Sequence, residues 1–107
     1  MDFTPAQIKT LERLLAGGFQ FVTFEKYPRF VGVERDGFVS LLEPAGGRLT
    51  PFGSPGYLFG SEIGVLLQRN DEKVFVCHKQ EVAATDQMLQ QYDQFKVDLA
   101  AHLDAVE

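Results

Sequence analysis

The sequence predicts one α+β domain spanning residues 1–107: an N-terminal helix, an antiparallel sheet of about five strands in two hairpin or meander units, and a long C-terminal amphipathic helix. Three observations carry this prediction. A capped helical stripe opens the chain, strand-length runs of Phe, Val and Leu follow between turn signals, and apolar residues then recur every three or four positions. A chain of 107 residues buries roughly 65% of its unfolded surface, so one core is expected.

The composition is 45% hydrophobic and 23% charged, which is typical of a soluble globular domain. The chain contains no apolar run of the roughly 18 residues that a membrane span needs and no signal-like start, so a cytoplasmic location is expected. Its single cysteine can form no internal disulfide. The net charge of −5 disfavours nucleic acid and anionic membranes as partners, because both attract basic surfaces.

The first helix is predicted from a capping box, in which the Thr4 hydroxyl accepts a hydrogen bond from the backbone N–H of Gln7 and the side-chain amide of Gln7 reaches back to Thr4. Pro5 suits the first helical position. Phe3 and Ile8 have the spacing of a hydrophobic staple. The apolar stripe comprises Ile8, Leu11, Leu14 and Leu15. Gly17-Gly18 predicts the end of the helix.

Residues 19–42 are predicted to form a β-meander. Phe19–Glu25 is rich in aromatic and β-branched residues, and Tyr27-Pro28 marks a reversal. A second reversal at 34–38 places Gly37 where a type I turn with a bulge needs positive φ.

Both faces of this meander are predicted to be apolar, because side chains two positions apart share a face. One set comprises Phe19, Phe21, Phe38 and Leu42, and the other comprises Val22, Phe24, Val39 and Leu41. A sheet with helices on one face only should alternate apolar and polar residues. Two alternatives stay open: the sheet curls around its own core, or its second face meets another molecule, most simply a second copy of the chain.

Residues 43–62 break the pattern with three prolines and five glycines, so no regular helix or long strand is expected there. Structureless segments of this length usually bind something or are mobile. We therefore predict a partner- or ligand-binding surface, which comprises Arg48, Phe52, Tyr57, Leu58 and Phe59. The alternative is two tight turns, at Gly46-Gly47 and Pro55-Gly56, around a short strand near 48–52 with the aromatic side chains folded onto the sheet.

A second hairpin is predicted with strands at 63–68 and 73–79 joined by a polar connection at 69–72. The last helix begins after Thr85, an N-cap candidate followed by Asp86, whose charge suits the helix dipole. Its apolar stripe comprises Met88, Tyr92, Phe95, Leu99, Leu103 and Val106.

The sequence contains no pattern that indicates a metal, cofactor or catalytic site. Cys77, His78 and His102 are the only soft ligands, and adjacent residues of a strand point to opposite faces, so Cys77 and His78 are expected neither to share a metal nor to act as nucleophile and base. Neither GxGxxG nor a P-loop occurs.

These observations favour a non-enzymatic protein-interaction or adaptor module, expected to be a homodimer or to bind another protein. The alternative is a small-ligand-binding domain, in which residues 43–62 close an apolar pocket and Arg48 or Arg29 receives an anionic group. Catalysis would require a titratable pair, such as His78 with a carboxylate, inside a cleft.

Overall fold

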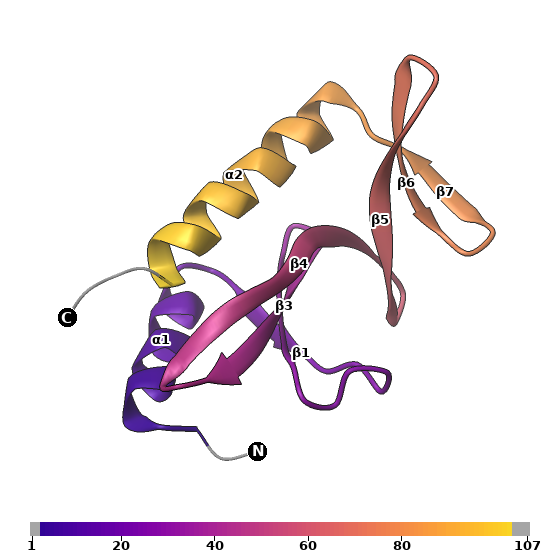
Figure 1. Cartoon of the computed structure of the whole chain (residues 1–107). Helices are drawn as coiled ribbons and strands as arrows, with labels where there is room; N and C mark the ends of the chain where they lie inside the picture. Colours follow the sequence, from indigo (N-terminus) through magenta and orange to yellow (C-terminus); the bar gives the residue numbers. More distant parts are fainter. Residues whose placement is uncertain (1–2, 104–107) are drawn as a thin grey trace.

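The computed structural model describes residues 3–103 and shows an α+β fold, in which one curled antiparallel sheet follows an N-terminal helix and precedes a C-terminal helix in the chain (Figure 1). The helices are α1 (Pro5–Ala16) and α2 (Asp86–Leu103). The strands are β1 (Gln20–Val22), β2 (Val31–Arg35), β3 (Phe38–Ala45), β4 (Arg48–Phe59), β5 (Glu62–Arg69), β6 (Glu72–Cys77) and β7 (Gln80–Ala83). The predicted fold class is confirmed, but the prediction of about five strands is wrong because the described chain has seven.

The seven strands follow one another in chain order, each antiparallel to the next. Strand β5 belongs to both halves of the sheet. Its first residues pair with β4, and Val65–Arg69 pair with β6. In Figure 1 the unit β5–β7 lies on the side of the molecule opposite α1. Neither helix within residues 3–103 has the length and hydrophobicity that crossing a membrane requires.

Strand β4 begins where the alternative interpretation of this segment expects a short strand, near 48–52, but it is longer and occupies most of the segment in which no long strand is expected. Prolines are tolerated in β4 where it has a neighbouring strand on one side only: β5 pairs with Tyr57–Phe59, so the segment that holds Pro51 and Pro55 borders β3 alone. A bulge in the pairing with β3 adjoins Pro55. The predicted turn at Gly46-Gly47 is confirmed by two positive φ angles, whereas Pro55-Gly56 lies within β4 and forms no turn.

Strand β7 was missed because no glycine, proline or asparagine marks the turn before it. The predicted strand through Lys79 ends at Cys77, which pairs with Gln80 across a two-residue turn. His78 opens this turn with a φ of 55°, an uncommon value for a residue other than glycine. The alternation of side chains therefore stops at Cys77.

Both predicted N-caps are confirmed. The Thr4 backbone N–H donates to Gln7 Oε1 at 2.9 Å and the Gln7 backbone N–H donates to Thr4 Oγ1 at 3.1 Å. Gln7 Nε2 also donates to the carbonyl of Arg48 at 3.0 Å, which ties the start of α1 to β4. Thr85 Oγ1 accepts from the backbone N–H of Met88 at 3.1 Å.

The apolar stripe predicted for α1 is only partly buried, since Leu14 is fully buried but Ile8 and Leu15 are 45% and 54% exposed. In α2 the predicted stripe faces the sheet, with Tyr92, Phe95 and Leu99 buried. Val106, the last predicted member, lies outside the described residues.

The main core lies between the helices and the sheet, and Phe38 is at its centre. The Phe38 ring contacts Tyr57, Phe75, Tyr92 and Phe95 at centroid distances of 5.5 to 6.4 Å. These rings come from β3, β4, β6 and α2. One side chain thus joins both halves of the sheet to the C-terminal helix.

The second apolar face forms a cluster of its own. Phe24, Val39 and Leu41 are buried there, and partly buried side chains that include Phe30 and Ile63 pack against them. The chain itself covers this face, so of the two alternatives the curled sheet is confirmed. The first set, Phe19, Phe38 and Leu42, is buried in the main core, except for Phe21, which is 39% exposed on the edge strand β1.

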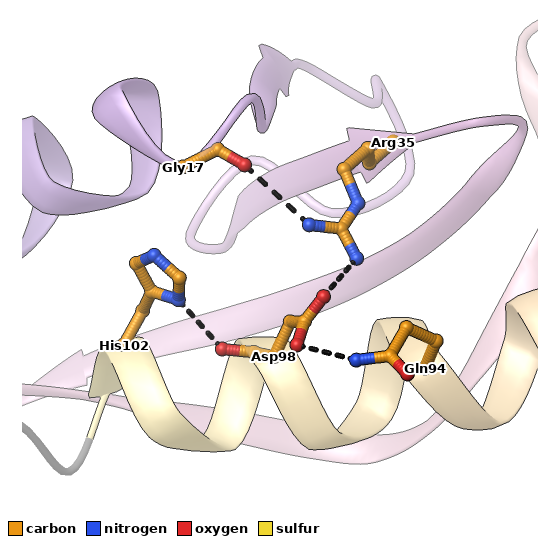
Figure 2. A network of polar contacts seen from close by, with 5 residues as sticks. All are labelled: Gly17, Arg35, Gln94, Asp98 and His102. Atoms are coloured by element: carbon orange, nitrogen blue, oxygen red, sulfur yellow. Dashed lines mark hydrogen bonds and ion pairs between the residues drawn. The ribbon is translucent and has the colours of Figure 1, made fainter.

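A polar network closes the junction of α1, β2 and α2 (Figure 2). Arg35 donates to Asp98 Oδ2 at 2.7 Å and to the carbonyl of Gly17 at 3.4 Å, and its guanidinium lies 4.5 Å from the centroid of the Phe19 ring. Gln94 Nε2 donates to the other oxygen of Asp98, and His102 Nδ1 donates to the Asp98 carbonyl. These hydrogen bonds give donors to the Gly17 carbonyl, to both carboxylate oxygens of Asp98 and to the Asp98 carbonyl.

Thr4→Ala should lower the free energy of unfolding by about 1 kcal/mol, because α1 loses its N-cap acceptor. Thermal or urea denaturation measures the change. Thr4→Ser keeps the hydroxyl and should unfold like the wild type, so equal losses in both variants would contradict the capping role.

Asp98→Asn should reveal a pH-dependent contribution to stability. Arg35, and then Gln94, hold the pKa of Asp98 below its ordinary value of 3.8 by donating hydrogen bonds to the carboxylate. The stability that Asp98 contributes is therefore complete above the ordinary pKa and is lost as the pH falls through the lower folded pKa. In urea denaturation at several pH values, the gap between wild type and Asp98→Asn should shrink below about pH 4. The control is Asp93→Asn at an exposed position of α2, which should leave the free energy of unfolding close to that of the wild type.

Candidate functional site

A pocket of about 600 Å³ opens on the side of the sheet that bears the second apolar cluster. The segment between β1 and β2, the turn before β5 and the end of β6 surround it. Its lining residues are Thr23, Phe24, Glu25, Lys26, Tyr27, Ser61, Glu62, Ile63, Cys77 and His78. Three segments distant in sequence therefore contribute to one concave site.

Glu62 is the centre of the polar side of this pocket, and its two carboxylate oxygens have different partners. Lys26 Nζ donates to Oε1 at 3.0 Å. His78 Nε2 lies 3.1 Å from Oε2, and the Cys77 thiol donates to the same oxygen at 3.7 Å. The ligand atoms of Glu62, Cys77 and His78 all lie within 4.8 Å of one another.

The backbone explains how adjacent residues reach the same carboxylate. Glu62 begins β5 directly after the turn at Gly60-Ser61, and Cys77 ends β6. His78 is the first turn residue, and its left-handed conformation directs the imidazole back toward Glu62 instead of to the opposite face. The prediction that Cys77 and His78 diverge is wrong for this reason: it assumed a strand where the chain turns.

The pKa values of Lys26, Glu62 and Cys77 depend on the contacts among these residues and His78. Hydrogen bonds from Lys26 and then from His78 lower the pKa of Glu62, and the same contact with Glu62 raises the pKa of Lys26. Burial, followed by the negative charge of Glu62, raises the pKa of the Cys77 thiol. The thiol is therefore protonated near neutral pH, whereas a cysteine nucleophile needs a lowered pKa.

An aromatic row borders the pocket on its apolar side. The rings of Phe24, Tyr27, Phe30 and Phe52 follow one another at centroid distances of 6.4, 6.1 and 4.7 Å. Phe24 is buried, while Tyr27 and Phe52 are 36% and 53% exposed. The pocket thus has one charged wall and one aromatic wall.

The five residues predicted as a binding surface do not meet at one site. Arg48 is exposed at the start of β4, and Phe52 stacks on Phe30. Tyr57 and Phe59 pack on the helix-side core, and Leu58 packs on the second cluster. Because β4 alternates between the two faces, its side chains are divided between two cores and the surface.

The cluster at the pocket was missed because its members come from three separate segments. The pair that catalysis would require, His78 with a carboxylate, is present at the pocket, because His78 Nε2 lies 3.1 Å from Glu62 Oε2. Nothing in the sequence identifies Glu62 or Lys26 as the partners of Cys77 and His78, since neither belongs to a motif. The local feature that brings the two residues together is the positive φ angle of His78, which the structure shows and the sequence does not signal.

Comparison with known proteins identifies no relative: no family model, no curated protein and no solved structure matches this chain. The functional argument therefore rests on the geometry of the described residues.

Glu62→Gln should lower the pKa of the Cys77 thiol part of the way toward its ordinary value, because the nearby negative charge is removed while burial persists. Lys26→Gln is the matched opposite change, since loss of a positive charge should raise the same pKa further. The pH dependence of iodoacetamide alkylation, measured with EDTA present, reports the pKa because only the thiolate reacts. Superimposable profiles for the three proteins would contradict the coupling.

Proposed function

We propose that this protein is a non-enzymatic interaction module that forms a homodimer through the outward face of β5–β7. This outward face is defined by Val65, Leu67, Val74 and Val76, which pair across β5 and β6 as Val65 with Val76 and Leu67 with Val74. Val74 is only 8% exposed and Val76 is half-buried, so the solvent-exposed part of this face comes from β5. Directly paired residues share a face of the sheet. Val65 and Leu67 are 54% and 43% exposed, and this exposed apolar surface is the observation that carries the proposal.

The opposite face of the same strands is already occupied. Phe75 is fully buried in the main core, and Leu66 packs against it. An antiparallel sheet with one face on a core normally presents polar residues on the other. The unit β5–β7 instead presents valine and leucine on both faces, which is typical of a sheet covered on both sides.

A second copy of the chain suits this surface better than a charged partner does. Arg69 and Glu81 form an ion pair and, by their pairing with Glu72 and Val76, lie on the outward face. The outward face therefore carries one positive and one negative side chain, although the whole chain has a net charge of −5. In a two-fold dimer each patch meets itself, so an Arg69 can face a Glu81 of the other copy without like-charge repulsion.

The proposed packing is face to face, with two apolar sheet surfaces about 10 Å apart. This arrangement buries Val65 and Leu67 in both copies.

The double variant Val65→Ser/Leu67→Ser should be monomeric under conditions where the wild type is dimeric. Four aliphatic side chains lose their burial per dimer, so the dissociation constant should rise on the order of 100-fold or more. Sedimentation equilibrium over a range of micromolar concentrations measures this change.

Val97→Ser is the matched control, because Val97 is 63% exposed on α2, outside the outward face. It should leave the dissociation constant unchanged. A wild-type protein that stays strictly monomeric at micromolar concentration would refute the proposed dimer.

A further inference from the structure

We infer that Glu62, Cys77 and His78 form a zinc site with one coordination position open to the pocket. The inference goes beyond the proposed dimer, since these residues lie at the pocket and not on the outward face. The inferred ligand atoms are Glu62 Oε2, Cys77 Sγ and His78 Nε2.

The spacing of these atoms already approaches that of zinc ligands. Zinc binds nitrogen and oxygen at about 2.0 Å and sulfur at about 2.3 Å in tetrahedral geometry, which places N and O about 3.3 Å apart and S and O about 3.5 Å apart. The observed separations from Oε2 are 3.1 Å to His78 Nε2 and 3.7 Å to Cys77 Sγ. Small side-chain rotations suffice to admit the ion, and His78 is free to make one because its side chain is 66% exposed.

The chemical type of the three ligands favours zinc over calcium and magnesium. One thiolate, one imidazole and one carboxylate form a borderline-soft set that suits zinc, whereas calcium and magnesium prefer oxygen ligands alone. Three protein ligands leave the fourth tetrahedral position for water or for a group bound in the pocket.

Lys26 supports the site as a positioning residue. It holds Oε1 of Glu62, so the carboxylate is oriented with Oε2 toward the cysteine and the histidine. Such contacts from outside the ligand set orient metal ligands in proteins. A thiolate and a carboxylate also neutralise the charge of Zn²⁺, which limits the repulsion between the ion and the Lys26 ammonium group.

Zinc binding replaces two existing contacts and needs no further reactant. The lone pair of His78 Nε2 and the Cys77 thiolate bind the ion. The thiol proton leaves to solvent. The proton between Nε2 and Oε2 leaves to solvent or moves to Nδ1 of the histidine. Cys77 is well placed for this because the end of β6 fixes its backbone and the side chain is buried beside the pocket.

The test is titration of the metal-free full-length chain with ZnCl₂ in an isothermal calorimeter. Saturation at one ion per chain is expected, and Co²⁺ in place of zinc should give a sulfur-to-metal charge-transfer band that Cys77→Ser abolishes. His78→Asn should weaken zinc binding by about tenfold or more. Asparagine tolerates positive φ, so this variant should keep the turn even if Cys77→Ser lowers stability.

His102→Gln is the matched control, because His102 is the other histidine of the chain and lies in the network of Arg35 and Asp98, away from the pocket. It should bind zinc like the wild type. Absence of one-to-one binding, or binding that His78→Asn and Cys77→Ser leave unchanged, would overturn the inference.

The same proteins separate this inference from the proposed dimer. His78→Asn should sediment like the wild type, and Val65→Ser/Leu67→Ser should still bind one zinc ion per chain. Loss of zinc binding in the dimer-deficient variant would overturn the assignment of the site to a single chain.

Discussion

The packing of Phe38 is the interaction on which the rest of the structure depends. The turn predicted at 34–38 is a two-residue turn at Asp36-Gly37 with positive φ at both positions, and not a type I turn with a bulge; it places Phe38 at the start of β3. From there its ring contacts aromatic side chains of β4, β6 and α2. A flat meander could not bring β3 and β6 to one ring, because β4 and β5 lie between them in the sheet order. The curl of the sheet and the position of α2 are thus consequences of filling one aromatic core.

Curling also creates the pocket. It brings the segment that carries Lys26 close to the first residue of β5 and to the end of β6. The second apolar cluster closes underneath, so Phe24 and Ile63 serve both the cluster and the pocket wall. Glu62 therefore has three polar partners at one wall of the pocket, where its own side chain is 38% exposed and those of Lys26 and His78 are each 66% exposed.

The networks around Asp98 and Glu62 differ in which of their side chains remain accessible. Asp98 is engaged by Arg35 and Gln94 across the junction of three elements, and this network supports the fold. Glu62 has similar partners, but its cysteine and histidine offer lone pairs to an open pocket. Similar ion-pair chemistry thus stabilises one region and, in the inferred zinc site, orients a metal ligand in another; the difference is the type of side chain beside the carboxylate.

The sequence by itself determined the elements whose signals are local: both N-caps, the turn at 34–38, the apolar stripe of α2 and the apolar character of both sheet faces. These depend on residues at most a few positions apart, so propensity and periodicity suffice. The full length of strand β4 escaped prediction because its prolines are acceptable only where one side of the strand has no neighbour, and β7 escaped because His78 supplies a turn that lacks the usual residues. The meeting of Lys26, Glu62, Cys77 and His78 was decided by tertiary structure alone, since long-range strand pairing and the curl of the sheet set those distances.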